Sequence, residues 1–395
     1  METTKLRVSI VGGGIGGLST AVALRRHGIE ATVFEQARTL GEVGAGVVLM
    51  PNALKLLDRL GLKDAMNRIG AAFSEESGYH LKDGTYVAPR IRHDSKQEYS
   101  LLGMHRADLL TALADALPAD SVRTGHRCVG FEQNATSATL TFDNGNVVES
   151  DIVLAADGIR STLQQYVVEP SEPIHSGMVA YRGLVAAADL PEGWPLLANR
   201  VWMGEGSHFL TFPVRNGEMV NYVGFLPSSE HAQESWSAPG DPKKLAAAFA
   251  TWDPQITGLL GSVESTFWWG LYDRTPLEKW VNGRLALVGD AAHPMLPHVG
   301  QGANQAIEDA YTLGVLLERV SPENVAEALL AYEQVRLPRA SQIQSKAREN
   351  GRRYDGEYDD LRERDAEIVA SSASRLETYD YDAGVAALAA AEALN

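Results

Sequence analysis

The hydrophobic pattern at the start of the chain predicts a strand, a glycine-rich turn, a helix and a second strand. β-Branched and apolar residues run from Lys5 to Val11, glycines follow, and apolar positions three and four apart continue to about His27. Residues 29–35, IEATVFE, again have the composition of a strand. A unit of about 30 residues with this order favours a parallel sheet.

The middle of the chain has a different pattern. From about Ile174 to Phe267, short runs alternate between apolar and polar residues. Residues 207–214 and 219–225 are two such runs, and residues 215–217, RNG, between them are typical of a hairpin turn. This region is therefore predicted to form an antiparallel sheet in a second domain.

Four further segments before that region fit the first domain. Apolar positions three and four apart predict helices over residues 52–60 and 107–117. Runs rich in β-branched and aromatic residues predict strands over 136–142 and 152–155.

After the second domain the chain returns to the first. Residues 284–288 have the pattern of a buried strand, and residues 304–320 have that of a helix. Beyond Pro322 the pattern is helical and strongly charged, and we expect Pro338 to interrupt it, because proline lacks the N–H that a helix interior needs.

The charge and the cysteine content exclude several classes of protein. The 35 Lys and Arg against 51 Asp and Glu give a net charge of -16, which argues against a nucleic-acid partner. No segment approaches the roughly 18 consecutive apolar residues of a membrane helix, and the apolar stretch from Val8 to Leu24 holds five glycines, so it does not resemble a signal peptide. Cys128 is the only cysteine, which excludes an intramolecular disulfide and fits a cytoplasmic location.

The first turn carries a dinucleotide-binding motif. Gly12, Gly14 and Gly17 form GxGxxG between the first strand and the first helix. In this motif the glycines allow the tight turn, the close approach of backbone to a pyrophosphate and the close packing of the helix. Glu35 ends the next strand, 18 residues after Gly17, where a carboxylate binds ribose hydroxyls. The motif alone does not decide between NAD and FAD.

Two later stretches decide that question. Residues 151–161 read DIVLAADGIRS, and residues 284–304 read RLALVGDAAHPMLPHVGQGAN. GxGxxG, then ADGxxS, then GDAAHxxxPxxGQGxN, in this order, resembles the single-component FAD-dependent aromatic hydroxylases over nearly the whole chain. The resemblance implies FAD as cofactor and NADH or NADPH as transient reductant, since no second GxGxxG occurs.

The resemblance also implies roles for the residues of the third motif. Asp290 would hydrogen-bond the ribityl or ribose hydroxyls of FAD, and Pro297 would lie against the flavin ring near the reacting carbon. The backbone at Gly302, Ala303 and Asn304 would reach the pyrimidine edge of the flavin. A helix that begins there points its positive end at the negative charge of reduced flavin.

Four more positions take a cofactor role from the resemblance. Arg106 would contact FAD near its phosphates or ribityl chain, and Gly46, in the stretch 44–46, would let backbone approach the flavin. Val129 stands where the family lays a strand over the adenine, and Asp157 belongs to the DG motif, which handles both FAD and the nicotinamide nucleotide. The family pattern has an arginine near Gln164 or Gln165, which this chain lacks.

The predicted fold class is therefore α/β. A Rossmann-like FAD-binding domain with a parallel sheet would take residues 1–172 and 273–335. An antiparallel β-sheet domain for the substrate would take residues 173–272, and a C-terminal helical segment would take residues 336–395.

The implied reaction is NAD(P)H-driven hydroxylation of an aromatic ring by O2 through a flavin C4a-hydroperoxide. That oxidant reacts well with a phenolate, so we expect a base at the substrate hydroxyl. His298 follows Pro297 and should project toward the substrate side of the flavin. His208 shares one strand face with Leu210 and Phe212, and it is the second candidate. His293 is expected to fix the turn, and no metal site is predicted, since no further ligand follows His293 and His298 at suitable spacing.

The substrate is expected to be a small hydroxylated aromatic acid. The chain most resembles the salicylate hydroxylase branch, with 3-hydroxybenzoate 6-hydroxylases and 6-hydroxynicotinate 3-monooxygenases close behind. Those two neighbours usually have tyrosine where this chain has Phe212, and the second usually has histidine at Val48, which favours a salicylate-like substrate and release of CO2. Arg182 and Arg215 are both candidates for binding the substrate carboxylate.

Two alternatives stay open. A ring oxygenase acting on urate or another heterocycle usually carries an acid where His298 stands. A flavin- or NAD-binding regulatory protein would bind nucleotide without turnover. The expected partners are the aromatic acid, O2 and NAD(P)H, with neither nucleic acid nor membrane, and the protein would be a monomer or a homodimer.

Overall fold

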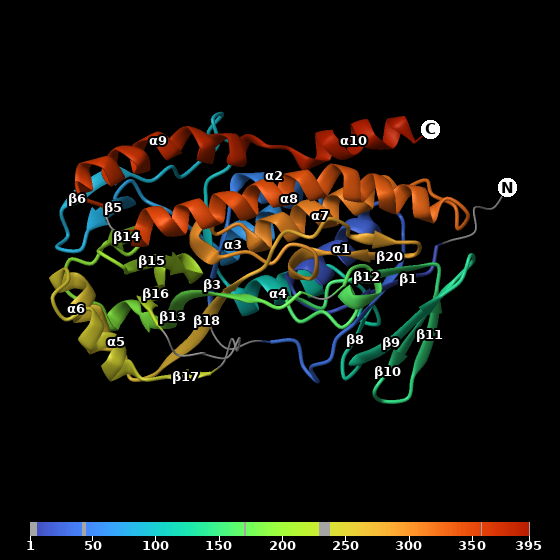
Figure 1. Ribbon diagram of the computed structural model, residues 1–395, viewed down its shortest axis with the longest axis horizontal. Coiled ribbons are helices and arrows are strands. Elements are labelled where there is room, and N and C mark those ends of the chain that lie inside the picture. Colours follow the sequence, from blue (N-terminus) through green and yellow to red (C-terminus); the bar gives the residue numbers. More distant parts are fainter. Residues whose placement is uncertain (1–5, 42–44, 170, 229–237, 357, 395) are drawn as a thin grey trace.

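The structure is a computed structural model that describes residues 6–41, 45–169, 171–228, 238–356 and 358–394. Two large sheets lie toward opposite ends of the long axis of the molecule, and one long helix, α8 (Val325–Asp355), runs along most of that axis (Figure 1). The α/β fold class is confirmed. No helix among the described residues is long and apolar enough to cross a membrane.

The first large sheet has six strands, and all of its neighbours are parallel except the edge pair β19–β20. In spatial order the strands are β19 (Val281–Asn282), β20 (Leu285–Leu287), β12 (Ile152–Ala155), β1 (Val8–Val11), β2 (Ala31–Phe34) and β8 (Val122–Arg123). Every residue of β1 and β12 is buried, as expected for strands covered on both faces. The strand, helix and strand predicted at the start of the chain are confirmed.

The second large sheet has eight strands and holds the predicted hairpin. In spatial order they are β17 (Pro239–Gly240), β18 (Thr266–Asp273), β13 (Ile174–Ala186), β16 (Met219–Pro227), β15 (His208–Val214), β14 (Arg200–Met203), β5 (Gly78–Leu81) and β6 (Tyr86–Pro89). All neighbours are antiparallel except β14 and β5. Asn216, at the tip between β15 and β16, has a φ of 53°, a conformation that asparagine tolerates. Strands β5 and β6 reach this sheet from the N-terminal part of the chain.

Two small sheets complete the strands. One is a meander of β9 (Cys128–Gln133), β10 (Ala138–Phe142) and β11 (Val147–Ser150), and the other joins β3 (Gly46–Leu49), β7 (Leu102–His105) and β4 (Ala71–Ala72). The β3–β7–β4 sheet packs against the large antiparallel sheet. It therefore connects the two halves of the molecule.

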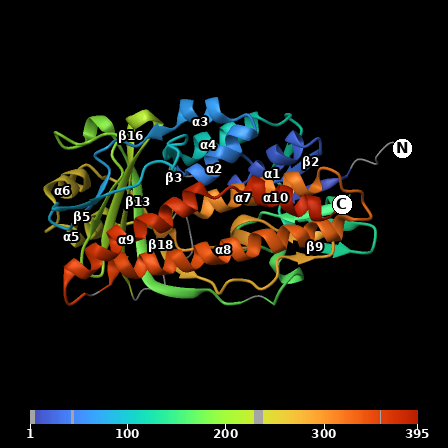
Figure 2. The same ribbon diagram turned by 90° about the horizontal axis from the view of Figure 1, so that it is seen from above.

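The helices cover the two large sheets (Figures 1 and 2). Apart from α8 they are α1 (Ile15–Arg26), α2 (Pro51–Arg59), α3 (Lys63–Ile69), α4 (Arg106–Asp115), α5 (Pro242–Ala248), α6 (Pro254–Gly261), α7 (Gly302–Leu317), α9 (Leu361–Asp380) and α10 (Ala383–Ala393). Short 3₁₀ turns lie at η1 (Gln164–Tyr166), η2 (Ala187–Asp189), η3 (Arg215–Gly217), η4 (Gly289–Ala291) and η5 (Pro297–Val299).

The expected break at Pro338 is wrong, because α8 continues through it to Asp355. Arg336, Ala340 and Ile343 are all buried on the two sides of the proline. Tertiary packing on these side chains outweighs the roughly 3 kcal/mol that an interior proline costs a helix. Because α8 is not interrupted at Pro338, its C-terminal turn reaches the antiparallel sheet, where the candidate histidine His208 lies.

The two faces of the antiparallel sheet differ. Phe209 and Tyr222 belong to a buried apolar cluster with residues of α5 and α6. On the opposite face, cross-strand pairing aligns His208 with Phe225 and Leu210 with Val223. The expectation that His208 and Leu210 share a face and Phe209 points away is thus confirmed by the register.

Candidate active site

The glycine turn between β1 and α1 has the stereochemistry that its motif predicts. Gly12 has a φ of 108°, and a Cβ there would overlap the carbonyl of Ala156. A Cβ on Gly17 would overlap the carbonyl oxygen of Gly12, so only glycine allows α1 to approach the strand this closely. By contrast, no described atom lies within 4 Å of the Cβ position of Gly14. The first and third glycines thus serve the protein's own packing, and the second leaves a ligand room.

The start of α1 suits an anion. Gly14 is the N-cap residue, no side chain caps this helix, and its first turn has no acid. The free N–H groups and the positive end of the helix dipole can therefore face a phosphate. Glu35, directly after β2, accepts hydrogen bonds from the N–H groups of Gly13 at 2.6 Å and Ala37 at 2.7 Å. Its carboxylate oxygens keep further lone pairs for a ribose hydroxyl.

The carboxyl end of β12 brings Asp157 close to the start of β9. Asp157 accepts the N–H of Thr162 at 2.8 Å, and its Oδ1 has no hydrogen-bond partner among the described residues. Burial raises the pKa of this carboxyl. On β9, Cys128 is buried and burial raises the pKa of its thiol to about 11, whereas Val129 is 49% exposed. An exposed valine over a buried neighbour offers an apolar surface to a flat ring.

Gln164, which stands where the family has an arginine, has a structural contact. Its side-chain N–H₂ donates to the carbonyl of Ala291 at 2.8 Å, and Gln164 is buried. The DG segment is thereby tied to η4. No local pattern marks this contact, since 127 residues separate the two positions.

Asp290, Arg106 and the first turn of α7 lie together at the ends of several elements. The Asp290 side chain is exposed, yet desolvation by the protein around it raises the pKa of its carboxyl, while charges on His293 and Arg106 oppose that rise. Such a carboxyl stands at the wall of a recess. A Cβ on Gly302 would lie 3.9 Å from Asp290 Oδ1, which places this carboxyl beside the start of α7.

The N-terminus of α7 is held in place by Asn304. Its Nδ2 donates to the carbonyls of Val48 at 3.0 Å and Gly300 at 2.9 Å, and its Oδ1 accepts the N–H of Met50 at 2.8 Å. The side chain is therefore fully used by the protein. Gly302 and Ala303 beside it are only half-buried, and α7 has neither a side-chain cap nor an acid in its first turn.

Gly46 has a different reason to be glycine from the one expected. A Cβ there would lie 2.6 Å from Phe212 Cζ and 2.8 Å from the Cβ of Asn221, so it would collide with the antiparallel sheet. The Gly46 N–H donates to Asn221 Oδ1 at 2.7 Å. Close packing of β3 on that sheet therefore excludes a side chain at Gly46, and the groups in contact there belong to the protein itself. Gly44, in the same predicted stretch, lies outside the described residues.

A buried ionic network behind the GD motif was missed by the sequence analysis. His293 Nε2 lies 2.6 Å from Asp309 Oδ2, which also accepts the N–H of Gly289 at 2.9 Å. Arg336 of α8 donates to Asp309 at 2.8 Å and to Glu308 at 2.5 Å. Burial opposes ionisation of Asp309, but His293 and Arg336 lower the pKa of its carboxyl to about 2. His293 fixes the turn, as expected, and α8 holds the motif against α7.

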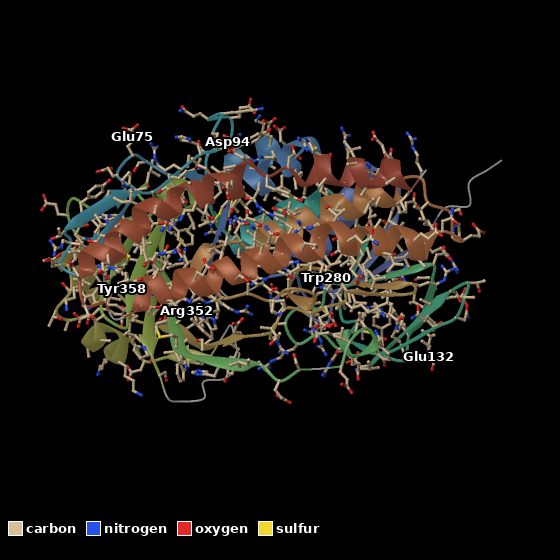
Figure 3. The ribbon with its side chains drawn as sticks, turned by 45° about the horizontal axis from the view of Figure 1, so that its top comes forward. Glu75, Asp94, Glu132, Trp280, Arg352 and Tyr358 are labelled. Carbon is tan, nitrogen blue, oxygen red and sulfur yellow. The ribbon has the colours of Figure 1, made fainter. Side chains whose placement is uncertain are left out.

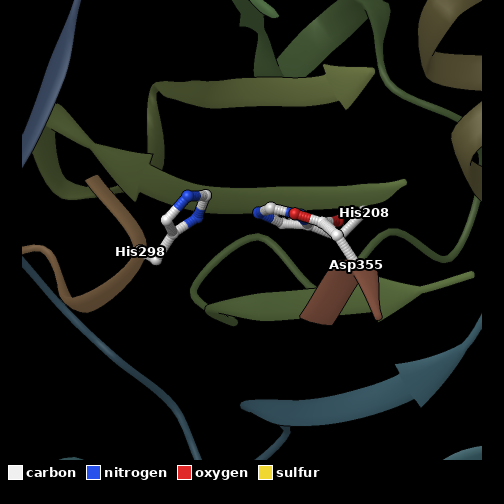
Figure 4. Close-up of side chains that lie close together, drawn as sticks. All are labelled: His208, His298 and Asp355. Carbon is white, nitrogen blue, oxygen red and sulfur yellow. The ribbon is translucent and has the colours of Figure 1, made fainter. Parts of the chain in front are cut away.

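The two candidate histidines lie together, and a third side chain joins them (Figure 4). The ring centroids of His208 and His298 are 5.4 Å apart, and His208 stacks on Phe225 at 4.0 Å. His208 Nδ1 lies 2.6 Å from Asp355 Oδ1, at the last residue of α8. His208 Nε2 is buried and has no hydrogen-bond partner among the described residues. One ring nitrogen of each histidine and one carboxylate oxygen of Asp355 all lie within 4.8 Å of one another.

His298 does not share the environment of its neighbour Pro297. Pro297 is exposed, whereas His298 is 9% exposed and lies against Gly351 of α8, where a Cβ would be 2.9 Å from His298 Nε2. Burial, with the nearby His208, lowers the pKa of His298 to about 3. At neutral pH this imidazole is uncharged. It can accept a hydrogen bond, but it is a weaker base than the sequence analysis assumed.

The two arginine candidates are now distinguished by position. Arg215 lies at the hairpin tip and donates twice to Asp108, at 2.7 and 2.8 Å. Arg182 is buried on β13, on the same sheet face as His208 and two strands away, with its guanidinium 4.9 Å from the centre of the Trp269 ring. Arg182 is the cation on the face that carries the histidine.

Comparison with known proteins shows the class. Residues 5–347 match the FAD binding domain family, to which the chain therefore belongs. The chain is 38% identical over 387 residues to a 3-amino-4-hydroxybenzoate 2-monooxygenase of Streptomyces platensis, with 96% of each chain covered. It is 35% identical over 378 residues to a salicylate hydroxylase of Pseudomonas putida, with 89% and 86% covered. A solved salicylate hydroxylase substrate complex superposes with a TM-score of 0.84 at 30% identity and covers 98% of both chains.

The protein is therefore an FAD-dependent aromatic-ring monooxygenase that uses NAD(P)H. The alternative of a nucleotide-binding regulator without turnover is set aside. Several groups of the structure fit FAD. The glycine turn and the uncapped start of α1 suit its phosphates, the uncapped start of α7 offers backbone N–H groups, and the carboxyl of Asp290 can bind a hydroxyl.

Proposed function

We propose that this enzyme hydroxylates a small benzoate whose ring carries a hydroxyl or amino group next to the carbon that receives oxygen. His208 is proposed to accept a hydrogen bond or a proton from that group. One observation carries this assignment: the buried His208 has its Nδ1 fixed by Asp355 and its Nε2 without a hydrogen-bond partner among the described residues. A carboxylate that faces Nδ1, as that of Asp355 does, holds an imidazole in one tautomer and stabilises it once it is protonated.

FAD, when bound, would take electrons from NAD(P)H and use them to activate O2, which is the oxidant of the reaction. The protein would contact it with groups at the ends of strands and helices. The proposed contacts are Gly14 at the pyrophosphate, in a turn that Gly12 and Gly17 shape by their packing, Glu35 at the ribose, Val129 at the adenine, Arg106, Asp157 and Asp290 along the phosphates and the ribityl chain, Pro297 at the ring, and the backbone of Gly302, Ala303 and Asn304 at the pyrimidine edge. Gly46 is proposed to act only through the packing of β3.

Apolar side chains beside His208 would exclude water from the substrate ring that is hydroxylated. Leu210, Val223 and Leu184 lie on the face of the sheet that carries His208 and are only partly buried, so they can contact an apolar ligand. Phe212, in the next cross-strand row, adds an aromatic edge. A dry site strengthens the interaction of His208 with a polar substituent. Arg182 is proposed to bind the substrate carboxylate.

His298 is proposed to act as a neutral acceptor. Its pKa of about 3 means that it is a neutral imidazole at neutral pH, so it does not act as an imidazolium acid toward the product. With His208 beside it, the pair has one imidazole whose Nδ1 faces the carboxylate of Asp355 and one that stays uncharged.

Two substrates satisfy this chemistry. The relatives named 3-amino-4-hydroxybenzoate 2-monooxygenase imply an amino group next to the hydroxylated carbon, and this candidate is favoured by 38% identity over 96% of both chains. Salicylate has its hydroxyl next to the carboxyl-bearing carbon, and hydroxylation there releases CO2. Phe212 and Val48, in place of polar residues, favour salicylate over 3-hydroxybenzoate or 6-hydroxynicotinate.

The experiment is a substrate panel. The FAD-loaded protein is mixed with NADH or NADPH and, in turn, with 3-amino-4-hydroxybenzoate, salicylate, 3-hydroxybenzoate, 6-hydroxynicotinate or urate, and product and H2O2 are both quantified. We expect hydroxylated product with one of the first two acids and little H2O2. Product formed only from urate or 6-hydroxynicotinate would contradict the proposal, because neither is a benzoate.

A further inference from the structure

A cationic pocket lies between α8 and α9, beside η5 and the residue that follows β6. Its volume is about 130 Å³, and its lining includes Arg90, Lys346, Arg353 and Arg375, while Glu349 is the one acid among the described residues around it. The chain as a whole has a net charge of -16, so four cations around one small cavity run against its composition. None of the strand residues that face His208 lines this pocket.

Two of these cations have no carboxylate partner in the part of the chain that the structure describes. Among the described residues no carboxylate pairs with Arg90 or Arg375, whereas Arg353 pairs with Glu367 at 3.2 Å and Lys346 lies 4.0 Å from Glu377. The Arg375 Nη2 atom is buried and has no hydrogen-bond partner there. A buried guanidinium with an unused N–H₂ group is costly unless an anion meets it.

The positive charges of Arg90 and Arg375 act on the neighbouring side chain of Tyr79. The guanidinium carbons of Arg90 and Arg375 lie 4.9 and 5.0 Å from the centre of the Tyr79 ring. Burial of Tyr79 acts to raise the pKa of its hydroxyl, yet Arg375 and Arg90, together with a hydrogen bond to Tyr354 and the charge of Arg353, lower it. The two arginines thus contribute a positive potential at this end of the pocket.

The rest of the lining suits a small aromatic ring. Tyr354 and Tyr379 are buried aromatic residues, and Ile343 and Val299 add apolar groups. On α9, Ser374 also lines the pocket. An engineered cavity of about 150 Å³ binds benzene, so a cavity of this volume accepts one ring.

We propose that this pocket binds a second small aromatic carboxylate, with its carboxylate against Arg375 and Arg90 and its ring against Tyr354 and Tyr379. This site goes beyond the proposed reaction and does not depend on which substrate is hydroxylated. Its lining includes His298 and Val299 of η5, next to Pro297. A ligand there would therefore stabilise the position of the segment that carries Pro297.

The test is benzoate binding to the FAD-loaded protein by titration calorimetry, with the flavin absorption spectrum recorded in parallel. We expect a binding event that leaves the flavin spectrum unchanged, weakened at least tenfold by Arg375→Gln. Arg352→Gln is the matched control, since Arg352 lies on α8, the other helix that lines the pocket, but is exposed and does not itself line it (Figure 3). Its benzoate binding should equal that of the wild type.

Arg375→Gln is checked for its circular dichroism spectrum and FAD content. If it fails to fold, Ser374→Leu, which fills the pocket and leaves the arginines, should abolish the flavin-silent binding. Wild-type binding only in step with the flavin spectrum, or unchanged binding in the variant that folds, would overturn the proposal. Displacement of benzoate by an equal concentration of inorganic phosphate would overturn the aromatic class of ligand. These outcomes are independent of the substrate panel, because no turnover is measured.

Discussion

Asp355 lies 2.6 Å from His208, although 147 residues separate them, and this pair joins the end of α8 to the antiparallel sheet. Its geometry orients the imidazole so that Nδ1 faces the carboxylate and Nε2 faces away. His208 is therefore a better candidate for the proton acceptor than the neighbouring His298, because a pKa of about 3 makes His298 a weak base that stays uncharged.

The first prediction concerns Asp355. Asp355→Asn keeps the size of the side chain but removes the charge that stabilises a protonated His208, so the rate of product formation should fall roughly 10- to 100-fold, within the range of general-base contributions. The pH profile of the rate should shift, while the rate of flavin reduction by NAD(P)H should stay close to wild type.

The exposed Asp359→Asn serves as the control for loss of one acid in the same region, and it should match the wild type. If Asp355→Asn and Asp359→Asn gave the same product yield and pH profile, Asp355 would have no role in positioning His208.

The second prediction concerns acid stability. An imidazole in the unfolded chain has a pKa near 6.5, whereas burial lowers that of His298 to about 3. Between these values the unfolded chain binds a proton that the folded chain does not, so stability that is present above pH 6.5 is lost as the pH falls toward 3. At pH 5 the loss is about 2 kcal/mol.

His298→Gln cannot titrate and should lack this part of the pH dependence. Urea unfolding at pH 7.5 and pH 5.0 measures it, with His126→Gln, on the surface of the β9–β11 meander, as the control. Equal pH dependence of stability in wild type and His298→Gln would show that the imidazole is not buried uncharged.

The third prediction separates two glycines of one motif. Gly17→Ala should unfold or strongly destabilise the protein, because its Cβ would overlap the carbonyl of Gly12. Gly14→Ala should leave the melting temperature of the apoprotein within a few degrees of wild type but weaken FAD binding at least tenfold, because its methyl group points where the pyrophosphate is proposed to lie. Flavin fluorescence titration and thermal melting check both, and normal FAD affinity in Gly14→Ala would place the pyrophosphate elsewhere.

The fourth prediction compares the two arginines. Arg182→Gln should raise the KM for the aromatic acid at least tenfold with a smaller change in the KM for NAD(P)H, because its guanidinium lies on the face that carries His208. Arg215→Gln breaks a partly exposed pair with Asp108 and should cost roughly 0.2–1 kcal/mol of stability with little effect on either KM. Equal effects on the KM for the acid would show that carboxylate binding has been assigned to the wrong residue.

The sequence predicts well what depends on neighbours along the chain. The β1–α1–β2 unit, the hairpin of β15 and β16 and the alternation that places His208 and Leu210 on one face are all local patterns, and the structure confirms them. The glycine motif and the long motif at residues 289–304 are likewise contiguous. They identify the cofactor and the class of enzyme before any tertiary contact is known.

The sequence fails where distant packing decides. Nothing around Asp355 marks it as a partner of His208, and the local rule for Pro338 predicts a break that packing of α8 overrides. Gly46 was expected to make room for the flavin, but the atoms that a Cβ there would meet belong to Phe212 of β15 and Asn221 of β16. The ionic network of Asp309 and Arg336 was likewise not visible, because its members lie on two separate helices.

We propose that this protein places an oxygen atom from O2 on a benzoate with a neighbouring hydroxyl or amino group. The most direct measurement is one turnover of the FAD-loaded, NAD(P)H-reduced protein under ¹⁸O2 with 3-amino-4-hydroxybenzoate or salicylate, followed by mass spectrometry of the product. We predict that one of the two acids yields a hydroxylated product carrying one ¹⁸O atom. Recovery of both acids unchanged, with the oxygen appearing only as labelled H2O2, would contradict the claim.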